Sequence, residues 1–134
     1  RMGDPETEVV IPRITSDLLD LMRRAAEGGL DDAPLEVDPR TAVTVMMVSG
    51  GYPGSYRKGL PITGLDKVTE TIPFQAGTRL TDDGTLVTYG GRVVALTSFG
   101  KDIPDALSRS YEAASEVHFE DSYFRRDIGL DLLR

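Results

Sequence analysis

The sequence SGGYPGSYRKG, residues 49–59, combines residue types that suit the binding of an anionic ligand. Gly50 and Gly51 lack a Cβ atom, so their backbone N–H groups can approach a ligand closely. Arg57 and Lys58 can then meet a phosphate or a carboxylate. A plain surface loop explains the same composition and remains an alternative. The residues of this segment that we expect to bind substrate are Gly50, Gly51, Tyr52, Pro53, Gly54 and Arg57.

The sequence FRRDIG, residues 124–129, is a second candidate for anion binding. Arg125 and Arg126 are adjacent, and Asp127 follows them directly. One arginine is suited to binding an anion while Asp127 orients the other. An ion pair at the surface or between domains is the alternative explanation. We include all three side chains among those expected to bind substrate.

The sequence RMGDPETE places Arg1, Asp4 and Glu6 close together at a predicted helix start. Carboxylates in such a position can act as general bases or can orient an arginine. Helix capping is the alternative, because Asp4 suits the cap position and Pro5 suits the first helical position. We expect Arg1, Asp4 and Glu6 to have catalytic roles.

The composition limits the classes of function that the chain can have. It has 134 residues, of which 40% are hydrophobic, and a net charge of -7, so it can fold around a core but lacks the basic surface that nucleic acid requires. The absence of cysteine excludes disulfides and thiolate metal sites. No apolar run approaches the ~20 residues of a membrane-spanning helix, and the charged first residues do not resemble a signal peptide. We therefore expect a cytoplasmic protein with no nucleic-acid or membrane partner.

The first part of the chain has a helical pattern. One short helix is expected to start at Asp4 and to end or kink at Pro12, and a second is expected from about Thr15 to the glycine pair Gly28–Gly29. The segment that follows, residues 30–40, is acidic and contains two prolines, which is typical of a linker. We place a domain boundary near Asp38, so that residues 1–38 belong to a different domain from residues 39–134.

Beyond this boundary the pattern predicts strands. Residues 41–48 are apolar on both faces, as in a central strand, whereas Pro73 marks residues 71–76 as an edge strand or a bulge. Residues 86–89 and 92–99 flank Gly90–Gly91, which predicts a tight hairpin. A helix capped by Asp102 is expected at residues 103–116. We therefore expect an α+β fold, a small and mostly antiparallel sheet with a helix packed on one face, preceded by two helices.

Several of these motifs occur together in one known family. The sequences RMGDPETEVVIPRI with SDLLDL, VSGGYPGSYRKG, FQAGT, DGTLVTYGGRVVALTSFGKD and YFRRDIG, in this order and spacing, resemble the phosphoribosylamine–glycine ligases, also called glycinamide ribonucleotide synthetases. The resemblance extends over nearly the whole chain. It implies an ATP-grasp ligase of purine biosynthesis that joins 5-phosphoribosylamine and glycine at the expense of ATP. The implied reaction passes through glycyl phosphate and yields ADP, phosphate and glycinamide ribonucleotide, with Mg²⁺ or Mn²⁺ as the metal ion.

The resemblance also implies which part of such an enzyme this chain represents. Residues 1–38 would be the last two helices of the ATP-grasp domain, and residues 39–134 would be the complete C-terminal domain. The family's metal ligands, a Glu and an Asn, are expected just upstream of Arg1, so we expect no metal ligand in this chain and no nucleotide bound to it alone. The isolated chain is expected to be inactive without the remaining N-terminal and ATP-grasp parts. The full enzyme is expected to be monomeric.

The same resemblance implies roles for the three candidate groups. Arg1 would lie beside the metal ligands and stabilise the acyl phosphate, and Asp4 and Glu6 belong to the same motif. The loop at residues 49–59 would face the catalytic cleft, with the FRRDIG segment on the same side. Two alternatives remain: the C-terminal domain of another ATP-grasp enzyme, such as a purine-pathway carboxylase, or a non-catalytic interaction module.

Overall fold

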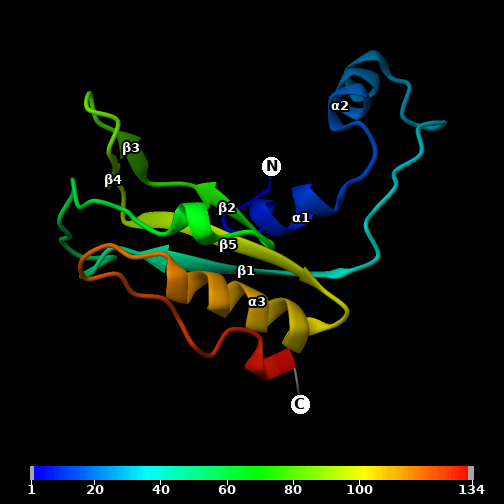
Figure 1. Ribbon diagram of the computed structural model, residues 1–134. Coiled ribbons are helices and arrows are strands. Elements are labelled where there is room, and N and C mark those ends of the chain that lie inside the picture. Colours follow the sequence, from blue (N-terminus) through cyan, green and yellow to red (C-terminus); the bar gives the residue numbers. More distant parts are fainter. Residues whose placement is uncertain (1, 133–134) are drawn as a thin grey trace.

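A three-stranded antiparallel sheet forms the centre of the molecule, seen in a computed structural model that describes residues 2–132 (Figure 1). Strand β5 (Arg92–Gly100) lies between β1 (Thr41–Val48) and β2 (Thr71–Gln75). Seven residues of β5 are fully or nearly fully buried, as expected for the middle strand of a sheet that is covered on both faces. Arg1, which was predicted to be catalytic, lies outside the described residues. Among the described helices, none has the length and hydrophobicity needed to cross a membrane.

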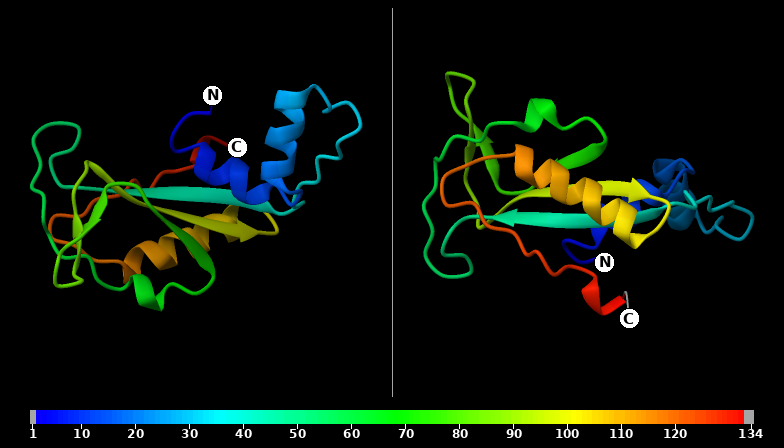
Figure 2. Two further views of the ribbon diagram at one scale, coloured as in Figure 1. Left: turned by 90° about the horizontal axis from the view of Figure 1, so that it is seen from above. Right: turned by 60° about the horizontal axis from the view of Figure 1, so that its bottom comes forward.

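Helices pack on both faces of this sheet. Helix α3 (Ile103–Glu116) covers one face and the shorter α1 (Thr7–Arg13) lies against the other, as the two views of Figure 2 also show. Successive residues of β5 contact the two helices in turn, because neighbouring side chains of a strand point to opposite faces of the sheet. Thr97 Oγ1 donates a hydrogen bond of 2.9 Å to the backbone oxygen of Glu8 in α1. Ser98 Oγ lies 3.0 Å from Ser110 Oγ in α3.

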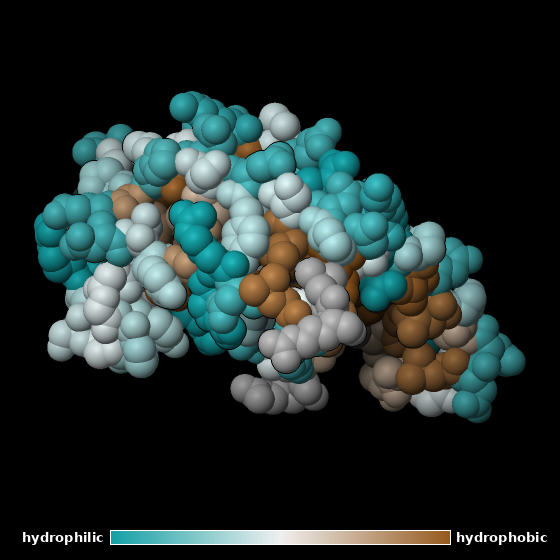
Figure 3. Space-filling model, turned by 90° about the horizontal axis from the view of Figure 1, so that it is seen from below, coloured by the Kyte–Doolittle hydropathy of each residue, from teal (hydrophilic) through white to brown (hydrophobic). Residues whose placement is uncertain are grey.

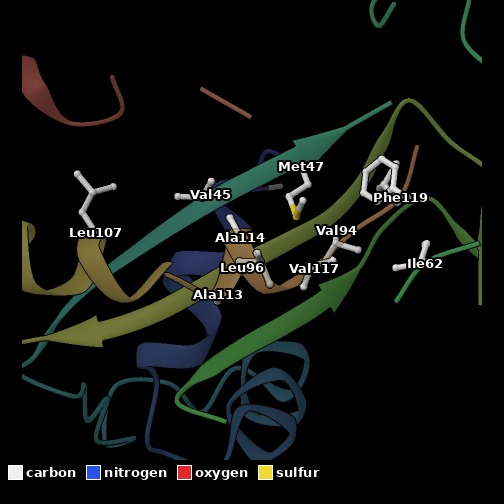
Figure 4. Packing of buried hydrophobic residues seen from close by; sticks show 11 residues of the cluster. Val45, Met47, Ile62, Val94, Leu96, Leu107, Ala113, Ala114, Val117 and Phe119 are labelled. Carbon is white, nitrogen blue, oxygen red and sulfur yellow. The ribbon is translucent and has the colours of Figure 1, made fainter. Parts of the chain in front are cut away.

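The hydrophobic core fills the space between the sheet and α3. Val45 and Met47 of β1 lie beside Leu96 of β5, and Ala114 of α3 and the following Val117 complete the layer (Figure 4). All five of these residues are at most 2% exposed. The buried residues of α3 recur at helical spacing, which turns one face of the helix to the core. Asp102 caps its first turn, with Oδ1 accepting a hydrogen bond of 2.9 Å from the N–H of Asp105.

A small second sheet lies at one end of the molecule. Strands β3 (Thr78–Leu80) and β4 (Leu86–Thr88) form a hairpin whose turn contains Gly84 at a φ of +85°. Asp82 and Asp83 lie in the same turn. Two short 3₁₀ helices lie outside both sheets, η1 (Leu65–Lys67) and η2 (Leu130–Leu132).

The structure confirms most of the predicted elements of the α+β domain. The strand at residues 41–48 and the helix at residues 103–116 have the predicted bounds. Strand β2 is an edge strand that pairs only with β5, and Pro73 is therefore tolerated in it. The predicted hairpin across Gly90–Gly91 is wrong: β4 pairs with β3, and β5 pairs with β1 and β2. The glycines are needed there for close packing, because a Cβ on Gly90 would lie 3.0 Å from Cα of Gly77.

The first helix starts later than the sequence predicts. Helix α1 begins at Thr7, and its cap residue Glu6 makes no side-chain capping hydrogen bond. Asp4 does not cap it, because its carboxylate binds a residue of β5 instead. Pro12 lies within the last turn, one residue before the helix ends at Arg13. The sequence offered capping as the alternative role for Asp4, and no local pattern indicates its partner in β5.

Helix α2 (Leu18–Glu27) lies apart from the sheet, at the end of the molecule opposite β3 and β4 (Figure 1). Asp17 caps it, and it ends at Gly28 with a φ of +79°, close to the predicted end. None of its residues is buried. The assignment of residues 1–38 to a separate domain stays a prediction, because α1 packs on the sheet and α2 does not.

Candidate functional site

The loop after β1 is held to the sheet at its first residue. The N–H of Ser49 donates a hydrogen bond of 2.8 Å to the backbone oxygen of Gly91, and Ser49 Oγ donates one of 3.0 Å to that of Gly90. A turn follows, in which the N–H of Tyr52 binds the oxygen of Ser49 at 3.0 Å. The N–H of Gly54 binds the oxygen of Gly51 at 2.8 Å. The segment therefore has a defined path rather than that of a loose surface loop.

Packing within the chain requires the two glycines at the start of this loop. A Cβ on Gly50 would lie 2.6 Å from Cβ of Asp121. Gly51 has a φ of +91°, and a Cβ there would overlap the backbone oxygen of Ser55. In the described part of the chain, neither glycine N–H donates a hydrogen bond to another backbone group. Both N–H groups are therefore free to bind a ligand or water.

Tyr52 has a packing role in the loop. Its ring meets that of Tyr56 edge to face, with centroids 6.3 Å apart. It also lies over Gly91, where any Cβ would overlap the ring. Tyr52 is still 41% exposed, so its outer face is open to solvent.

Arg57 is paired with a carboxylate. Its Nη1 donates a hydrogen bond of 2.6 Å to Oε1 of Glu120, and this bond raises the pKa of Arg57 above its ordinary value. Both side chains are more than half exposed, so an anionic ligand can compete with Glu120 for the guanidinium. For Arg57 to contact a substrate as predicted, an anionic group of that substrate must replace the Glu120 carboxylate.

The FRRDIG segment shows the predicted pairing of an arginine with Asp127. Arg125 donates two hydrogen bonds to the carboxylate of Asp127, at 2.9 Å and 3.0 Å. These bonds lower the pKa of Asp127 below its ordinary value. Arg126 instead lies over the ring of Phe124, with 4.8 Å between Cζ and the centroid. Phe124 packs in turn on Tyr111 of α3, with centroids 6.0 Å apart. Among the described residues, Arg126 is the arginine of this pair without a carboxylate partner.

Asp4 is bound to the start of β5. Its Oδ2 lies 2.9 Å from Nη2 of Arg92, and its backbone oxygen accepts a hydrogen bond of 3.1 Å from Nη1 of the same arginine. Glu6 bends back on its own segment, with Oε1 accepting a hydrogen bond of 2.5 Å from the N–H of Gly3. The two carboxylates therefore face different partners.

Asp4 and the loop after β1 meet at one end of the sheet, where the residue before the FRRDIG segment also lies. Arg92, which binds Asp4, lies opposite Val48 at the end of β1, and the glycine loop begins two residues later. The N–H of Tyr123, just before the FRRDIG segment, donates a hydrogen bond of 3.0 Å to the oxygen of Val48. The chain thus brings Asp4, the loop and the start of the FRRDIG segment to the last residue of β1. Arg57 is paired with Glu120, and Arg125 is paired with Asp127.

A large cavity lies away from this end of the sheet. It has a volume of about 580 Å³ and lies between β2 and α3, where its lining includes Lys67, Glu70, Arg109 and Glu112. Arg109 is already paired with Glu70 at 2.6 Å, and no sequence motif points to this hollow. Among residues 2–132, no group of three or more His, Asp or Glu side chains is placed to hold a metal ion.

Sequence analysis did not name Arg79 of this region as a possible ligand contact, whereas it named Lys58 beside Arg57. Lys58 Nζ lies 4.7 Å from the ring centroid of Tyr89, and Arg79 Cζ lies 5.3 Å from the same centroid. Arg79 directly follows the motif FQAGT, and Tyr89 lies within the motif VTYGGR. Neither motif alone shows that the two residues meet. Their proximity depends on strand pairing that local sequence does not specify.

Comparisons with known proteins agree with the motifs. A family model described as "Phosphoribosylglycinamide synthetase, C domain" matches residues 42–131. The phosphoribosylamine–glycine ligase of Escherichia coli (strain K12) is 43% identical over 131 residues, which cover 96% of this chain and 30% of that protein. The ligase of the same name from Chlorobaculum tepidum is 43% identical over 136 residues, covering 99% of this chain and 32% of the relative.

A solved structure shows the same fold. The phosphoribosylamine–glycine ligase of Thermotoga maritima superposes with a TM-score of 0.82 at 37% sequence identity, covering 95% of this chain and 31% of that one. The chain spans about a third of the length of these relatives. Since the family model matches well over half of the 134 residues, the chain belongs to the phosphoribosylglycinamide synthetase C-domain family.

Proposed function

We propose that the chain is the C-terminal part of a phosphoribosylamine–glycine ligase of purine biosynthesis. The enzyme would join 5-phosphoribosylamine and glycine with the cleavage of ATP to ADP and phosphate. The observation that supports this most strongly is the bond between Asp4 and Arg92, because it brings the GDPE motif to the strand end where the glycine loop begins. The relatives that match almost the whole chain share this activity in their names.

The proposed reaction has two chemical steps. A carboxylate oxygen of glycine attacks the γ-phosphorus of ATP, which gives glycyl phosphate and ADP. The amine of phosphoribosylamine then attacks the acyl carbon, and the C–O bond to phosphate breaks as the amide forms. Both steps place negative charge on phosphoryl oxygens, which N–H donors and cations stabilise.

This chain would contribute anion binding at the edge of the cleft. The free N–H groups of Gly50 and Gly51 are suited to a phosphoryl or carboxylate oxygen. Arg57 can exchange Glu120 for the ligand, and Arg126 has no carboxylate partner among the described residues. Asp4 acts as a positioning residue, because its bond to Arg92 fixes the segment that also includes Glu6.

We place ATP and the Mg²⁺ or Mn²⁺ ion in the part of the ligase that this chain does not span. An ATP-grasp domain would hold both, and residues 1–38 would be its last segment. The proposal also places the enzyme in the cytoplasm as a monomer, although the Arabidopsis thaliana relative is named as chloroplastic.

Exposed apolar side chains support contact with a further part of the enzyme. In the described part of the chain, seven of the fourteen exposed large hydrophobic residues fall within residues 1–38. Leu19 and Met22 of α2 are 77% and 58% exposed. Figure 3 shows hydrophobic residues gathered at the α2 end of the molecule. Such a patch is typical of an interface.

A chimeric enzyme tests the proposed function. The matching segment of the Escherichia coli ligase is replaced by this chain, and ADP formation is measured with and without glycine and phosphoribosylamine. We expect ADP formation that depends on both substrates, and none from this chain alone or from the Escherichia coli enzyme lacking the segment. A folded chimera without substrate-dependent turnover, or a turnover by the isolated chain, contradicts the proposal.

A further inference from the structure

Three segments of the chain meet beside the glycine loop. The N–H of Gly59 donates a hydrogen bond of 2.6 Å to the backbone oxygen of Thr88, and the N–H of Tyr89 donates one of 2.7 Å to that of Gly77. Thr88 also pairs with Thr78 in the β3–β4 hairpin. These backbone bonds set the last residue of the loop, the end of β4 and the start of β3 side by side. The positions of the side chains at this junction therefore follow from the main chain.

Two cations lie against one aromatic ring at this junction. Lys58 Nζ and Arg79 Cζ are 4.7 Å and 5.3 Å from the ring centroid of Tyr89, which is 50% exposed. All three residues line one open cavity of about 390 Å³, a size that suits a small organic ligand. The apolar side chains of Leu80 and Val87 line the same cavity.

The charges of this cavity are not balanced within the chain. The neighbouring cations Arg57 and Arg92 are each paired with a carboxylate. Neither Lys58 nor Arg79 has an ion-pair partner in the part of the chain that the structure describes, and Asp82 is the one acidic residue among those that line the cavity. The lining thus has a net positive charge in a protein whose overall charge is -7. The face of Tyr89 offsets part of the repulsion between the two cations, and a bound anion would remove more of it.

We infer that Lys58, Arg79 and Tyr89 form a binding site for the phosphate group of a small phosphate monoester. A monoester has close to two negative charges near neutral pH and can accept hydrogen bonds from both cations. The apolar lining and the exposed ring would contact the carbon skeleton. In one respect the inference rests on the proposed function, because it assigns the phosphate of phosphoribosylamine to this cavity, with Gly50 and Gly51 left for the reacting groups.

Binding to the 134-residue chain itself tests the site without any ligase assay. Ribose 5-phosphate is titrated into ¹⁵N-labelled protein, with inorganic phosphate and unphosphorylated ribose as separate probes, and amide shifts are followed by NMR. We expect ribose 5-phosphate to shift the amides of Lys58, Gly59, Arg79 and Tyr89 at millimolar concentration, and ribose to shift none of them. Inorganic phosphate is expected to bind more weakly at the same residues. Shifts that are absent, or that are centred elsewhere, overturn the inference.

Matched variants separate this site from general charge attraction. Lys58→Gln combined with Arg79→Gln is expected to weaken ribose 5-phosphate binding by about tenfold or more, as the loss of charge-assisted hydrogen bonds predicts. Lys101→Gln, at an exposed lysine after β5, removes one charge elsewhere and is expected to leave binding unchanged. The NMR spectra also show whether each variant is folded. Equal affinity in the double variant and the parent chain overturns the inference.

The chimeric ligase then connects the site to its substrate. Lys58→Gln is expected to raise the KM for phosphoribosylamine by about tenfold while the KM for glycine stays unchanged. Ribose 5-phosphate binding without ligase activity in the chimera would leave the phosphate site standing and refute the proposed function. If the chimera is active and Lys58→Gln leaves its KM for phosphoribosylamine unchanged, the assignment of the phosphoribosylamine phosphate to this cavity is refuted.

Discussion

Arg92 Nη2 lies 2.9 Å from Asp4 Oδ2 and joins residues that are 88 positions apart in the sequence. The bond places the start of the chain against the first residue of the central strand, opposite the last residue of β1. The glycine loop leaves the sheet at this point, so one ion pair relates two motifs that sequence alone shows only as separate. Both side chains are partly exposed, at 37% and 46%, so the pair orients the segment more than it stabilises the fold.

A double-mutant cycle tests this division of roles. Asp4→Asn, Arg92→Gln and the double variant are unfolded with urea, and the coupling between the two residues is obtained from the free energies of unfolding. We expect a coupling free energy of less than about 1 kcal/mol, as for other exposed pairs. In the chimeric ligase each single variant is expected to lower kcat/KM by about tenfold, because the Asp4 segment loses its position. A coupling above about 2 kcal/mol, as for a buried pair, would contradict the positioning role.

The core and the α2 surface should respond very differently to truncation. Leu96 is fully buried between the sheet and α3, and Leu96→Ala is expected to lower the free energy of unfolding by about 2–5 kcal/mol. Met22 in α2 is 58% exposed, and Met22→Ala should change it by less than about 0.5 kcal/mol. Chemical denaturation of the isolated chain measures both. A large loss for Met22→Ala would show that α2 packs on the domain.

The glycine loop predicts a contrast between two glycines with similar backbone angles. Gly51 and Gly28 have φ values of +91° and +79°, but a Cβ overlaps Ser55 only at Gly51. Gly28→Ala is expected to cost about 1–2 kcal/mol of stability from backbone strain alone. Gly51→Ala should cost about 1–3 kcal/mol more, because the new methyl group also overpacks. Equal losses of stability in urea would show that the loop has a different path.

The pair of Asp38 and Arg40 predicts a local titration. A hydrogen bond from the Arg40 side chain is the main cause that lowers the pKa of Asp38, from 3.8 to about 2. Because the folded-state pKa is depressed, the stabilising effect of this group is present above pH 3.8 and disappears as the pH falls towards 2. In Arg40→Gln the pKa of Asp38 is expected to return towards 3.8. An NMR titration of the Asp38 carboxyl group in both proteins checks this, and identical titration curves would refute the pairing.

Local patterns were sufficient for the elements whose signals lie within a few residues. The apolar run of β1 and the cap residue Asp102 of α3 specify these elements directly, and Pro73 marks the edge strand. Strand pairing was less accessible. Gly90 and Gly91 suggested a hairpin, but their lack of side chains serves contacts with Gly77 and Tyr52, which only the folded chain brings near.

The candidate site shows the same limit. The motifs identified the glycine loop and the FRRDIG segment, and the pairing of Asp127 with an arginine was anticipated. The partners of Asp4 and Arg57 were not, because Arg92 and Glu120 lie far away in sequence. Lys58, Arg79 and Tyr89 meet through hydrogen bonds between three separate segments, so no local pattern predicts their contact.

Hydrogen–deuterium exchange of the chimeric ligase, with and without phosphoribosylamine and glycine, tests most directly whether substrates bind at the end of β1. We expect the substrates to slow exchange in residues 49–59 and 88–92, where the loop and the start of β5 meet. The larger hollow lined by Lys67, Glu70 and Arg109 should exchange at the same rate in both states. Protection of that hollow with no change in the loop would contradict the account.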